Sequence, residues 1–490
     1  MTQTRSIDAA SIQARITPLR SELDEAGLGR FAPHRWRHQA ATLPVLHLDD
    51  VSGIPFLDGI PGVEEYQHRA GTRAGEGDLF AATTQPVPGY EHYCRTALGL
   101  GSAEAVIAEP VDPAVAVARA CRRGAALDTL VARAQDAGGL AIHPYMGIEA
   151  VWELAADVAD HSGAPVHVLA PPPPVTWLAN DKKTLSQLVD ALLGPDYLVE
   201  TFSANQTRRL AEHLADLASR HRRVALKRLR CASAMGNLVF DSIHVDTSPI
   251  PDLTAEVDAF LERTAWDGEQ DVLAVAWEEA FSSPSTQIWI PLPDEGPPRL
   301  EGIYEQLLEG DACIFVGSRP SSLPAAIEEQ LAHASLTVAT ALQQLGYVGR
   351  CSFDFLAVGD PEGDFRTPFV ECNGRWGGTS TPMSLLDRLL AQRRSDGQPF
   401  EPCSDHGPPR PHYRAQDFVH PQLVGAAFTD VLDAVGDALY DPGTGRGTFA
   451  FYNVGPLVGS GKLDVIAVAG SHEESEAAVH DELPKRLGLR

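Results

Sequence analysis

Several polar residues in the segment Cys351–Met383 have the types and spacing of a metal and phosphate site. The segment predicts two strands joined by a turn-rich stretch, with Asp354 on the first strand and Glu371 and Asn373 on the second. Residues two apart in a strand point to the same face, so Glu371 and Asn373 project together and Asp354 can face them. Two carboxylates and an amide oxygen suit Mg²⁺ (or Mn²⁺), with phosphate oxygens completing its shell. Arg375 brings a cation to the same edge, although an ordinary hairpin with surface acids also fits the isolated pattern.

A second group of residues, upstream of this segment, could bind phosphates and a base. Lys227 lies inside the apolar run VALKRL, where a lysine is unusual, and the small-residue loop CASAMGN follows it. The backbone amides of such a loop, which holds Ser233 and Gly236, can cover phosphates. Further on, VLAVAWEEAFSSPSTQIWI predicts two strands joined by an acidic stretch, an edge that could hold adenine through backbone groups. Taken singly, these features also fit a snorkelling lysine, a plain loop and an amphipathic turn.

The elements that must position these side chains fall into three regions. In residues 1–174, short apolar runs at 105–108, 140–143 and 165–169 alternate with helical patterns. This alternation predicts a parallel, Rossmann-like sheet. No G-x-G-x-x-G motif follows any of these strands, so dinucleotide binding is not predicted.

The rest of the chain is predicted to hold a core at 175–391 and a linker with a small unit at 392–490. The prolines Pro171–Pro174 indicate a linker, because proline continues neither a helix nor a central strand, and Asn180 is expected to cap the helix that follows. The last unit predicts two strands and a helix that Pro484 should end. The fold class is therefore α/β, with a small α+β unit at the end.

Composition excludes several classes of partner. The 490 residues include 39 Lys and Arg against 66 Asp and Glu, a formal net charge of −27, which disfavours nucleic acid and anionic membranes as partners. No apolar stretch is long enough to span a bilayer, and the first residues lack an apolar signal-peptide core. The seven cysteines are scattered without a C-x-x-C pair, which favours neither disulfides nor a zinc cluster and suggests a reduced, cytoplasmic setting.

In this order, the parts between 175 and 390 resemble the ATP-grasp superfamily. Asn180-Asp181-Lys182-Lys183 looks like the family's first ATP-contacting lysine at the start of a helix, with Lys182 favoured and Lys183 the alternative. Lys227 looks like the second lysine, and the loop after it like the family's flexible loop over the phosphates. The resemblance assigns ATP binding to Lys182, Lys227, Ser233, Gly236, Glu278, Glu279, Phe281 and Ser285, metal binding to Asp354, Glu371 and Asn373, and catalysis to Arg375 and Arg350.

This sequence departs from the family pattern at two positions. Ser285 stands where an acid normally bonds the ribose, and Ser352 stands where ligases of the D-alanine type carry an arginine before the metal aspartate. The second departure argues against a D-alanine-type ligase. It leaves Arg375, with Arg350 as a second candidate, to stabilise developing negative charge.

The layout of the whole chain resembles the pheganomycin-type peptide ligases, which join a carboxylate to an amine. The resemblance implies a cytoplasmic, ADP-forming ligase with ATP and Mg²⁺ (or Mn²⁺) as cofactors, an acyl-phosphate intermediate, small-molecule or peptide substrates and a role in peptide-antibiotic biosynthesis; members are often homodimers. The alternatives are an ATP-grasp carboxylase or thioester-forming synthetase, a non-catalytic nucleotide-binding protein, and a binding module built on the first region. A P-loop at Gly455–Lys462 is rejected because its glycine spacing is one residue too long and Leu463 follows the lysine.

Overall fold

The first region of the chain forms a parallel sheet with the strand order β3-β2-β1-β4-β5. The computed structural model describes residues 9–55, 57, 60, 62–230, 236–310, 313–392, 403 and 406–489. The predicted apolar runs form β3 (Glu104–Ile107), β4 (Leu140–Pro144) and β5 (Val166–Val168), while β1 (Val45–Leu48) and β2 (Leu79–Ala82) complete the sheet. Each neighbouring pair of strands is parallel, which confirms the predicted Rossmann-like region.

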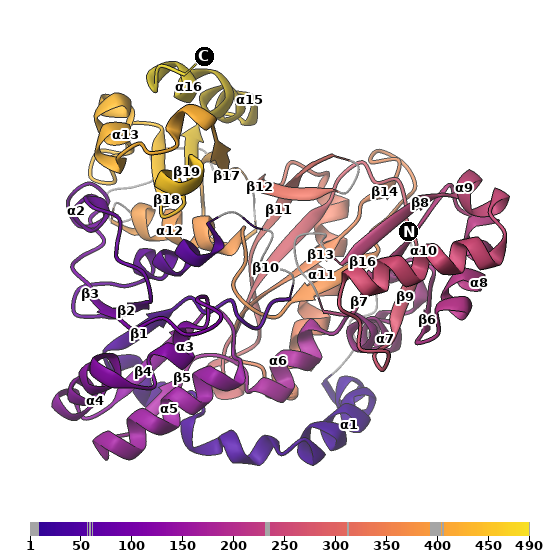
Figure 1. Ribbon diagram of the computed structural model, residues 1–490, viewed down its shortest axis with the longest axis horizontal. Coiled ribbons are helices and arrows are strands. Elements are labelled where there is room, and N and C mark those ends of the chain that lie inside the picture. The colour runs from indigo at the N-terminus through magenta and orange to yellow at the C-terminus, as the bar shows by residue number, and fades with distance from the viewer. Residues whose placement is uncertain are drawn as a thin grey trace.

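Helices pack against this parallel sheet and bury its apolar strands. They are α3 (Val117–Ala120), α4 (Gly124–Ala137) and α5 (Glu149–Ser162), and short 3-10 segments add η1 (Leu28–His34), η2 (His38–Thr42) and η4 (Val63–Thr72). Leu46, Leu48 and Ile142 share one core with the inner faces of the helices. In Figure 1 this region occupies the indigo to purple part of the ribbon.

A small antiparallel sheet with the order β6-β9-β7-β8 carries the predicted second lysine. Its strands are β6 (Thr201–Ala204), β7 (Arg223–Arg228), β8 (Asn237–Asp241) and β9 (Val272–Ala276). The helices α8 (Thr207–Ala218), α9 (Ser242–Thr247) and α10 (Ile250–Arg263) contribute to its core, together with Val224 and Leu226. Lys227 therefore lies on an inner strand of this sheet.

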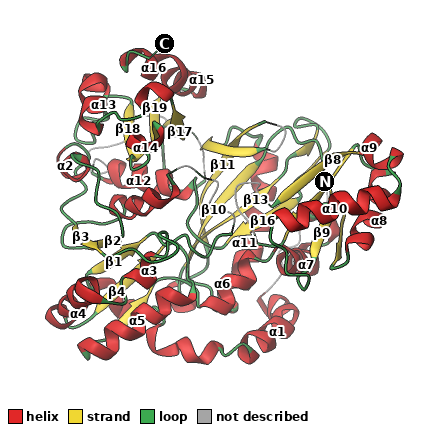
Figure 2. Cartoon of the chain, viewed as in Figure 1, coloured by secondary structure: helices red, strands yellow, loops and turns green. Residues whose placement is uncertain are grey.

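A large antiparallel sheet carries the predicted metal ligands and runs on into the C-terminal unit (Figure 2). Its order is β16 (Phe369–Asn373), β13 (Gly349–Phe355), β10 (Pro284–Ile290), β11 (Arg299–Glu309), β12 (Ile314–Pro320), β17 (His412–Val419), β19 (Lys462–Ala469) and β18 (Phe449–Asn453). The predicted hairpin of β13 and β16 is confirmed, with β14 (Val358–Gly359) and β15 (Phe365–Arg366) at its turn. β12 meets β17 through Gly317↔Gln416 and Ser318↔Ala415, so the last unit extends this sheet.

The helices beside the large sheet divide between two cores. A core shared with strands of the sheet holds α1 (Ala9–Glu25), α6 (Pro173–Asn180), α7 (Lys182–Leu193) and α11 (Ala325–Gln344), whereas α12 (Ser380–Ala391) packs in the core of the C-terminal unit. Ile12, Ile16 and Leu23 of α1 are buried in the same core as apolar residues of α7 and α11. The first helix thus packs on the middle region of the chain, and the predicted boundary at residue 174 stays a prediction.

Two helix boundaries differ from the prediction because proline and asparagine act at other places. Pro173 is the first residue of α6, where a missing N–H costs nothing, so the proline run enters a helix. Asn180 ends α6, and the cap of α7 is Asp181, whose Oδ1 accepts from the Thr184 N–H at 3.0 Å. The prediction that Asn180 caps this helix is therefore wrong.

The C-terminal unit adds short helices around β17, β18 and β19. They are α13 (Phe428–Val435), α14 (Leu457–Ser460), α15 (His472–Ala477) and α16 (Leu483–Arg486). The first region contributes one more helix to this unit, α2 (Tyr90–Thr96). A π-helical turn, Ala478–Glu482, joins α15 to α16, so Pro484 falls in the first turn of a new helix and does not end the old one. The rejected P-loop segment connects the antiparallel pair β18 and β19.

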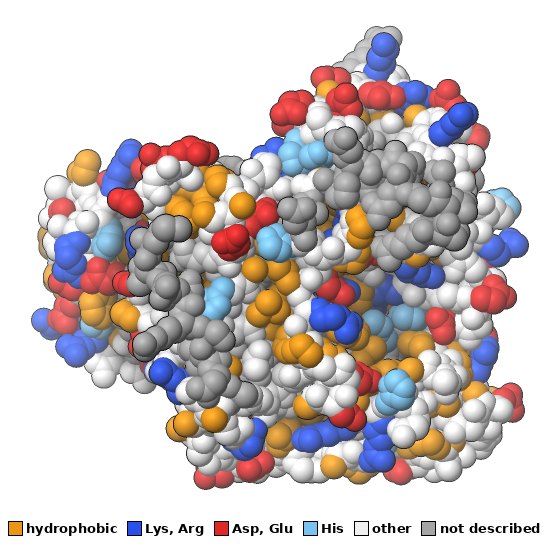
Figure 3. Space-filling view, turned by 180° about the vertical axis from the view of Figure 1, so that it is seen from behind, with side chains coloured by type: hydrophobic (Ala, Val, Ile, Leu, Met, Phe, Trp, Pro, Cys, Tyr) orange, Lys and Arg blue, Asp and Glu red, His pale blue; other side chains and the backbone are white. Residues whose placement is uncertain are grey.

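No helix in the described ranges is both long and apolar enough to cross a membrane. On the face seen from behind, acidic and basic side chains lie interspersed (Figure 3).

Candidate active site

Asp354, Glu371 and Asn373, here called the metal triad, come together at the β13–β16 hairpin. Asp354 is the cross-strand partner of Glu371, and Ser352 is that of Asn373. Asp354 accepts hydrogen bonds from Asn373 Nδ2 at 2.9 Å and from Ser285 Oγ at 2.7 Å. The spacing predicted from sequence thus places all three side chains on one face of the sheet.

The electrostatics of the metal triad show two acids competing for limited positive charge. Burial and the neighbouring Glu371 raise the pKa of Asp354 to about 7, in spite of the hydrogen bonds from Ser285 and Asn373. Burial opposes ionisation of Glu371 as well, but Lys182, Lys227 and Arg375 outweigh it and lower the pKa of its carboxyl. A pair of buried acids in this state fits a divalent cation.

The donor set also fits such an ion chemically. No group of three or more His, Cys, Asp or Glu side chains that could hold a metal lies in the described ranges. Two carboxylates and an amide group are a sparse set, which suits Mg²⁺ because that ion keeps several water or phosphate ligands. Asp354, Glu371 and Asn373 are therefore the residues that could hold it.

The two adjacent lysines at the start of α7 point to different partners. Lys182 is buried, and its Nζ lies 2.6 Å from Glu371 Oε2. Lys183 instead pairs with Asp271, the residue before β9. This placement favours Lys182 over Lys183 as a phosphate-binding residue.

Lys227 faces the same site from the small sheet. Its Nζ lies 5.2 Å from the ring centroid of Trp277, and its charge acts on Glu371. The loop after β7 is described only in part: Ser233 lies outside the described residues, and the carbonyl oxygen of Gly236 accepts from the Arg228 N–H at 2.9 Å.

Arg375 is held in place by Asn180, a residue to which the sequence analysis gave another role. Arg375 Nη1 donates to Asn180 Oδ1 at 2.5 Å, and the Gly374 N–H donates to the same oxygen at 3.1 Å. A Cβ on Gly374 would lie 2.7 Å from Asn180 Nδ2, so this close approach requires glycine. A polar residue ending an otherwise apolar helix is the signal that could have identified Asn180.

Arg350 lies away from the metal triad, although it is on the same strand as Asp354. It pairs with Glu301, and its guanidinium carbon lies 5.8 Å from the Trp289 ring centroid and 4.8 Å from that of Trp376. Arg350 and Arg375 line the same small space beside Trp376. The contacts place Arg350 behind Arg375, and its predicted catalytic role stays a prediction.

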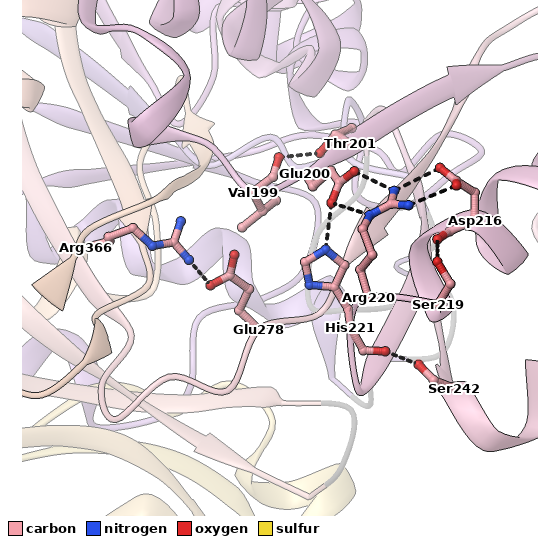
Figure 4. A network of polar contacts seen from close by, with 10 residues as sticks. All are labelled: Val199, Glu200, Thr201, Asp216, Ser219, Arg220, His221, Ser242, Glu278 and Arg366. Atoms are coloured by element: carbon pink, nitrogen blue, oxygen red, sulfur yellow. Dashed lines mark hydrogen bonds and ion pairs between the residues drawn. The ribbon is translucent and has the colours of Figure 1, made fainter.

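The predicted adenine hinge links the two antiparallel sheets. Glu278 lies 2.5 Å from Arg366 Nη2, which Figure 4 shows, and Glu279 lies 2.6 Å from Arg222 Nη1. The Phe281 N–H donates to the Ala357 carbonyl oxygen at 2.9 Å. Ser285, predicted to replace a ribose-binding acid, donates instead to Asp354, and its ribose role stays untested.

A cavity of about 430 Å³ opens beside the metal triad where the three predicted regions of the chain meet. Gln287, Arg375 and the segment 377–379 line it near the triad. Another part of its lining, here called the charged wall, comes from η4 and the C-terminal strands. The charged wall consists of Tyr66, Arg69, Asp417, Lys462 and Asp464.

The sequence analysis did not identify the charged wall. The sequence places Lys462 at the end of the rejected P-loop segment. Lys462 and Asp464 are also polar residues two apart in the apolar run KLDVIAVA. That spacing places both on one face of β19 and is the signal that could have found them. The partners from η4 lie about four hundred residues away in the chain, as Lys462 and Tyr66 show with a separation of 396.

Comparisons with known proteins agree with this architecture. Residues 67–159 match the family model described as the Pre ATP-grasp domain. An N5-carboxyaminoimidazole ribonucleotide synthetase, solved as an ADP complex, is similar over 91% of this chain and 97% of its own, with 12% identity and a TM-score of 0.50. The chain has the ATP-grasp fold.

Two further ATP-grasp structures are similar at lower scores. A biotin carboxylase from Campylobacter jejuni has 12% identity and a TM-score of 0.48, and covers 85% of this chain and 86% of its own. A D-alanyl-alanine synthetase A from Vibrio cholerae has 13% identity and a TM-score of 0.36, and covers 53% and 72%. No curated protein matches the ATP-grasp chain described here.

Proposed function

We propose that this protein is an ATP-dependent carboxylate–amine ligase that forms an amide or peptide bond through an acyl-phosphate. The observation that carries the proposal is the meeting of Asp354, Glu371 and Asn373 with Lys182 and Arg375 at a cavity of about 430 Å³. Acids for a metal, a lysine for phosphates and an arginine for an oxyanion are the groups that this chemistry needs. The setting that we propose is peptide natural-product biosynthesis in the cytoplasm.

Each of these side chains is proposed to act at a particular step of the reaction. Lys182 and Lys227 hold phosphate oxygens of ATP, while the substrate carboxylate oxygen attacks the γ-phosphorus and the bond to the β-phosphate oxygen breaks. Asp354, Glu371 and Asn373 would hold a divalent cation, which would neutralise phosphate charge. The amine nitrogen then attacks the acyl carbon, Arg375 donates to the oxyanion, and inorganic phosphate leaves. The products are the amide, ADP, phosphate and a proton.

Such a reaction needs protection from water more than it needs a protein nucleophile. No Cys or His side chain lines the described part of the cavity. An acyl-phosphate hydrolyses if water reaches it, and a cavity formed by the pre-ATP-grasp region, the core and the C-terminal unit suits that requirement. We propose that residues 1–174 are the pre-ATP-grasp region, residues 175–391 the ATP-grasp core, and residues 392–490 the linker and C-terminal unit.

The direct test is ADP release by the full chain with Mg²⁺, ATP and pairs of candidate acids and amines, with mass detection of the product. The proposal expects ADP and an amide only when an acid and an amine are both present. ADP release with bicarbonate and an amine would indicate a carboxylase, and release with a thiol acceptor would indicate a thioester-forming synthetase. ATP binding without turnover in any combination would contradict the proposal.

A further inference from the structure

The charged wall has more hydrogen-bonding capacity than its own contacts use. Arg69 is only 7% exposed; its Nε donates to the Tyr66 carbonyl oxygen at 3.1 Å and lies 3.5 Å from Asp49 Oδ2 on the same edge. The guanidinium carbon lies 4.6 Å from the Tyr66 ring centroid and 5.2 Å from that of Tyr145. Its two terminal nitrogens donate no hydrogen bond to the residues that the structure describes. One edge of Arg69 is therefore fixed, and its two-pronged edge is left for a ligand.

Asp464 presents the complementary group. It is 6% exposed, and its Oδ2 accepts from Asn453 Nδ2 at 2.9 Å. Its other oxygen, Oδ1, is buried and has no hydrogen-bond partner in the described part of the chain. Arg69 and Asp464 line the same cavity, and the positive charge of Arg69 favours the ionised form of Asp464. A buried carboxylate oxygen without a donor is costly and calls for an N–H group.

A purely structural ion cluster does not account for these groups. Lys462 already performs that role, because its Nζ pairs with Asp417 and lies 2.7 Å from Tyr66 Oη, joining β17 and β19 to η4. A cluster built only for stability would also satisfy Asp464 Oδ1 and the terminal nitrogens of Arg69. The two incompletely satisfied groups belong to the same cavity as the metal triad.

The balance of charge on the wall selects the class of ligand. The wall carries both signs, with Arg69 and Lys462 beside Asp417 and Asp464. A phosphate group would meet two carboxylates, and a simple cation would meet two cations. A small molecule that carries one positive and one negative group side by side matches both.

We propose that the charged wall binds a free amino acid as a zwitterion, with Arg69 donating to its carboxylate and Asp464 Oδ1 accepting from its ammonium group. This inference rests on the proposed ligase function, in which the acid substrate reacts beside the metal triad. The amino acid on the charged wall is accordingly the amine-donating substrate, since its carboxylate is held and does not react.

The first test measures binding without turnover. The full chain, without ATP, is titrated with each protein amino acid, with the corresponding amino-acid amide and with ribose 5-phosphate, and binding is followed by calorimetry and thermal shift. We expect at least one amino acid to bind and its amide, which lacks the carboxylate, to bind about tenfold or more weakly. The inference is overturned if no amino acid binds at millimolar concentration, if the amides bind equally well, or if ribose 5-phosphate binds in their place.

Variants then locate the bound amino acid. Arg69→Gln and Asp464→Asn should each weaken binding of the best amino acid about tenfold or more, and Arg69→Lys should weaken it less. Arg133→Gln, at a partly exposed arginine of the same region that pairs with Glu104, should not change the affinity. Variants that lower the melting temperature but keep the affinity would overturn the inference. If Arg69→Gln does not fold, Arg69→Lys and Asp464→Asn decide.

A final variant separates this inference from the proposed function. Glu371→Gln should bind the amino acid as the parent does while forming no ADP. Amino-acid binding in a parent chain that never forms ADP would contradict the ligase proposal alone. A second outcome would contradict the zwitterion site alone: the parent forms ADP from an acid and an amine, and that amine binds to Arg69→Gln as tightly as to the parent.

Discussion

Charges at the cavity and charges at the outer end of the small sheet are held in opposite ways. In the outer network, which Figure 4 shows, Arg220 lies 2.7 Å from Glu200 and 2.9 Å from Asp216, and His221 lies 2.7 Å from Glu200. These side chains are solvent-accessible, and each acid faces a base. At the cavity, by contrast, the half-buried Asp354 lies beside another acid, its cross-strand partner Glu371.

The same contrast appears in the pKa values of the cavity acids. Burial and Asp417 raise the pKa of Asp464 to about 8, just as burial and Glu371 raise that of Asp354. Packing carboxylates together in a low-dielectric site opposes folding, whereas exposed pairs are nearly neutral in effect. Strained electrostatics of this kind gather at functional sites. Four changes, from the largest expected effect to the smallest, test this contrast.

The largest effect is expected from Glu371→Gln, which removes one charge of the metal triad and keeps its shape. Loss of a residue that hydrogen-bonds a metal ligand lowers metal affinity or activity about 10- to 100-fold. Loss of a proposed ligand itself should therefore lower kcat for ADP formation by more than about 100-fold. The matched control is Glu362→Gln, an exposed acid at the turn of the same hairpin, which should leave kcat unchanged. Equal activity of Glu371→Gln and the parent would remove the metal assignment.

The next effect distinguishes the two adjacent lysines. Lys182→Met should raise KM for ATP about tenfold or more, because a charge-assisted hydrogen bond contributes about 1.5–3 kcal/mol. Lys183→Met, which loses only the partly exposed pair with Asp271, should change KM less than about twofold. Steady-state kinetics with varied ATP measures both, and the reverse order of effects would assign Lys183 to ATP.

A smaller effect is expected from Gly374→Ala, which leaves every charged group in place. The added Cβ would lie 2.7 Å from Asn180 Nδ2 and would displace the side chain that holds Arg375. A small misplacement of Arg375 should lower kcat by about tenfold or less, with KM for ATP little changed. Gly459→Ala, where no atom lies within 4 Å of the added Cβ, serves as control. An unchanged kcat would show that Asn180 does not position Arg375.

The smallest effect is expected at the outer network. Arg220→Ala removes its contacts with Glu200 and Asp216, but all three groups are exposed and screened by solvent. We expect the rate of ADP formation to match the parent and the melting temperature, measured by calorimetry, to change little. A large loss of activity would mean that the small sheet depends on these pairs to place Lys227.

The meeting of the three metal-triad side chains was predictable because its geometry is local. Asp354, Glu371 and Asn373 lie on paired strands joined by a turn, and the two-residue alternation of a strand fixes which side chains meet. The parallel sheet was predictable in part for the same reason, from short apolar runs between helical patterns.

Features built from distant segments could not be predicted in this way. The charged wall joins η4 to β17 and β19, and no local pattern specifies that pairing. Asn180 resembled a helix cap because caps are polar residues before a helix, but Asp181 takes that role and frees Asn180 to hold Arg375. Pro484 resembled a helix end because the π-helical turn before it has no sequence signature.

The most direct test of the ligase proposal follows one oxygen atom. The acid that supports ADP release is labelled with ¹⁸O in its carboxylate, and the inorganic phosphate formed is examined by mass spectrometry. Attack of the carboxylate on the γ-phosphorus predicts that each phosphate released with product carries one ¹⁸O from the acid. Unlabelled phosphate released together with product would show that no acyl-phosphate forms and would contradict the account.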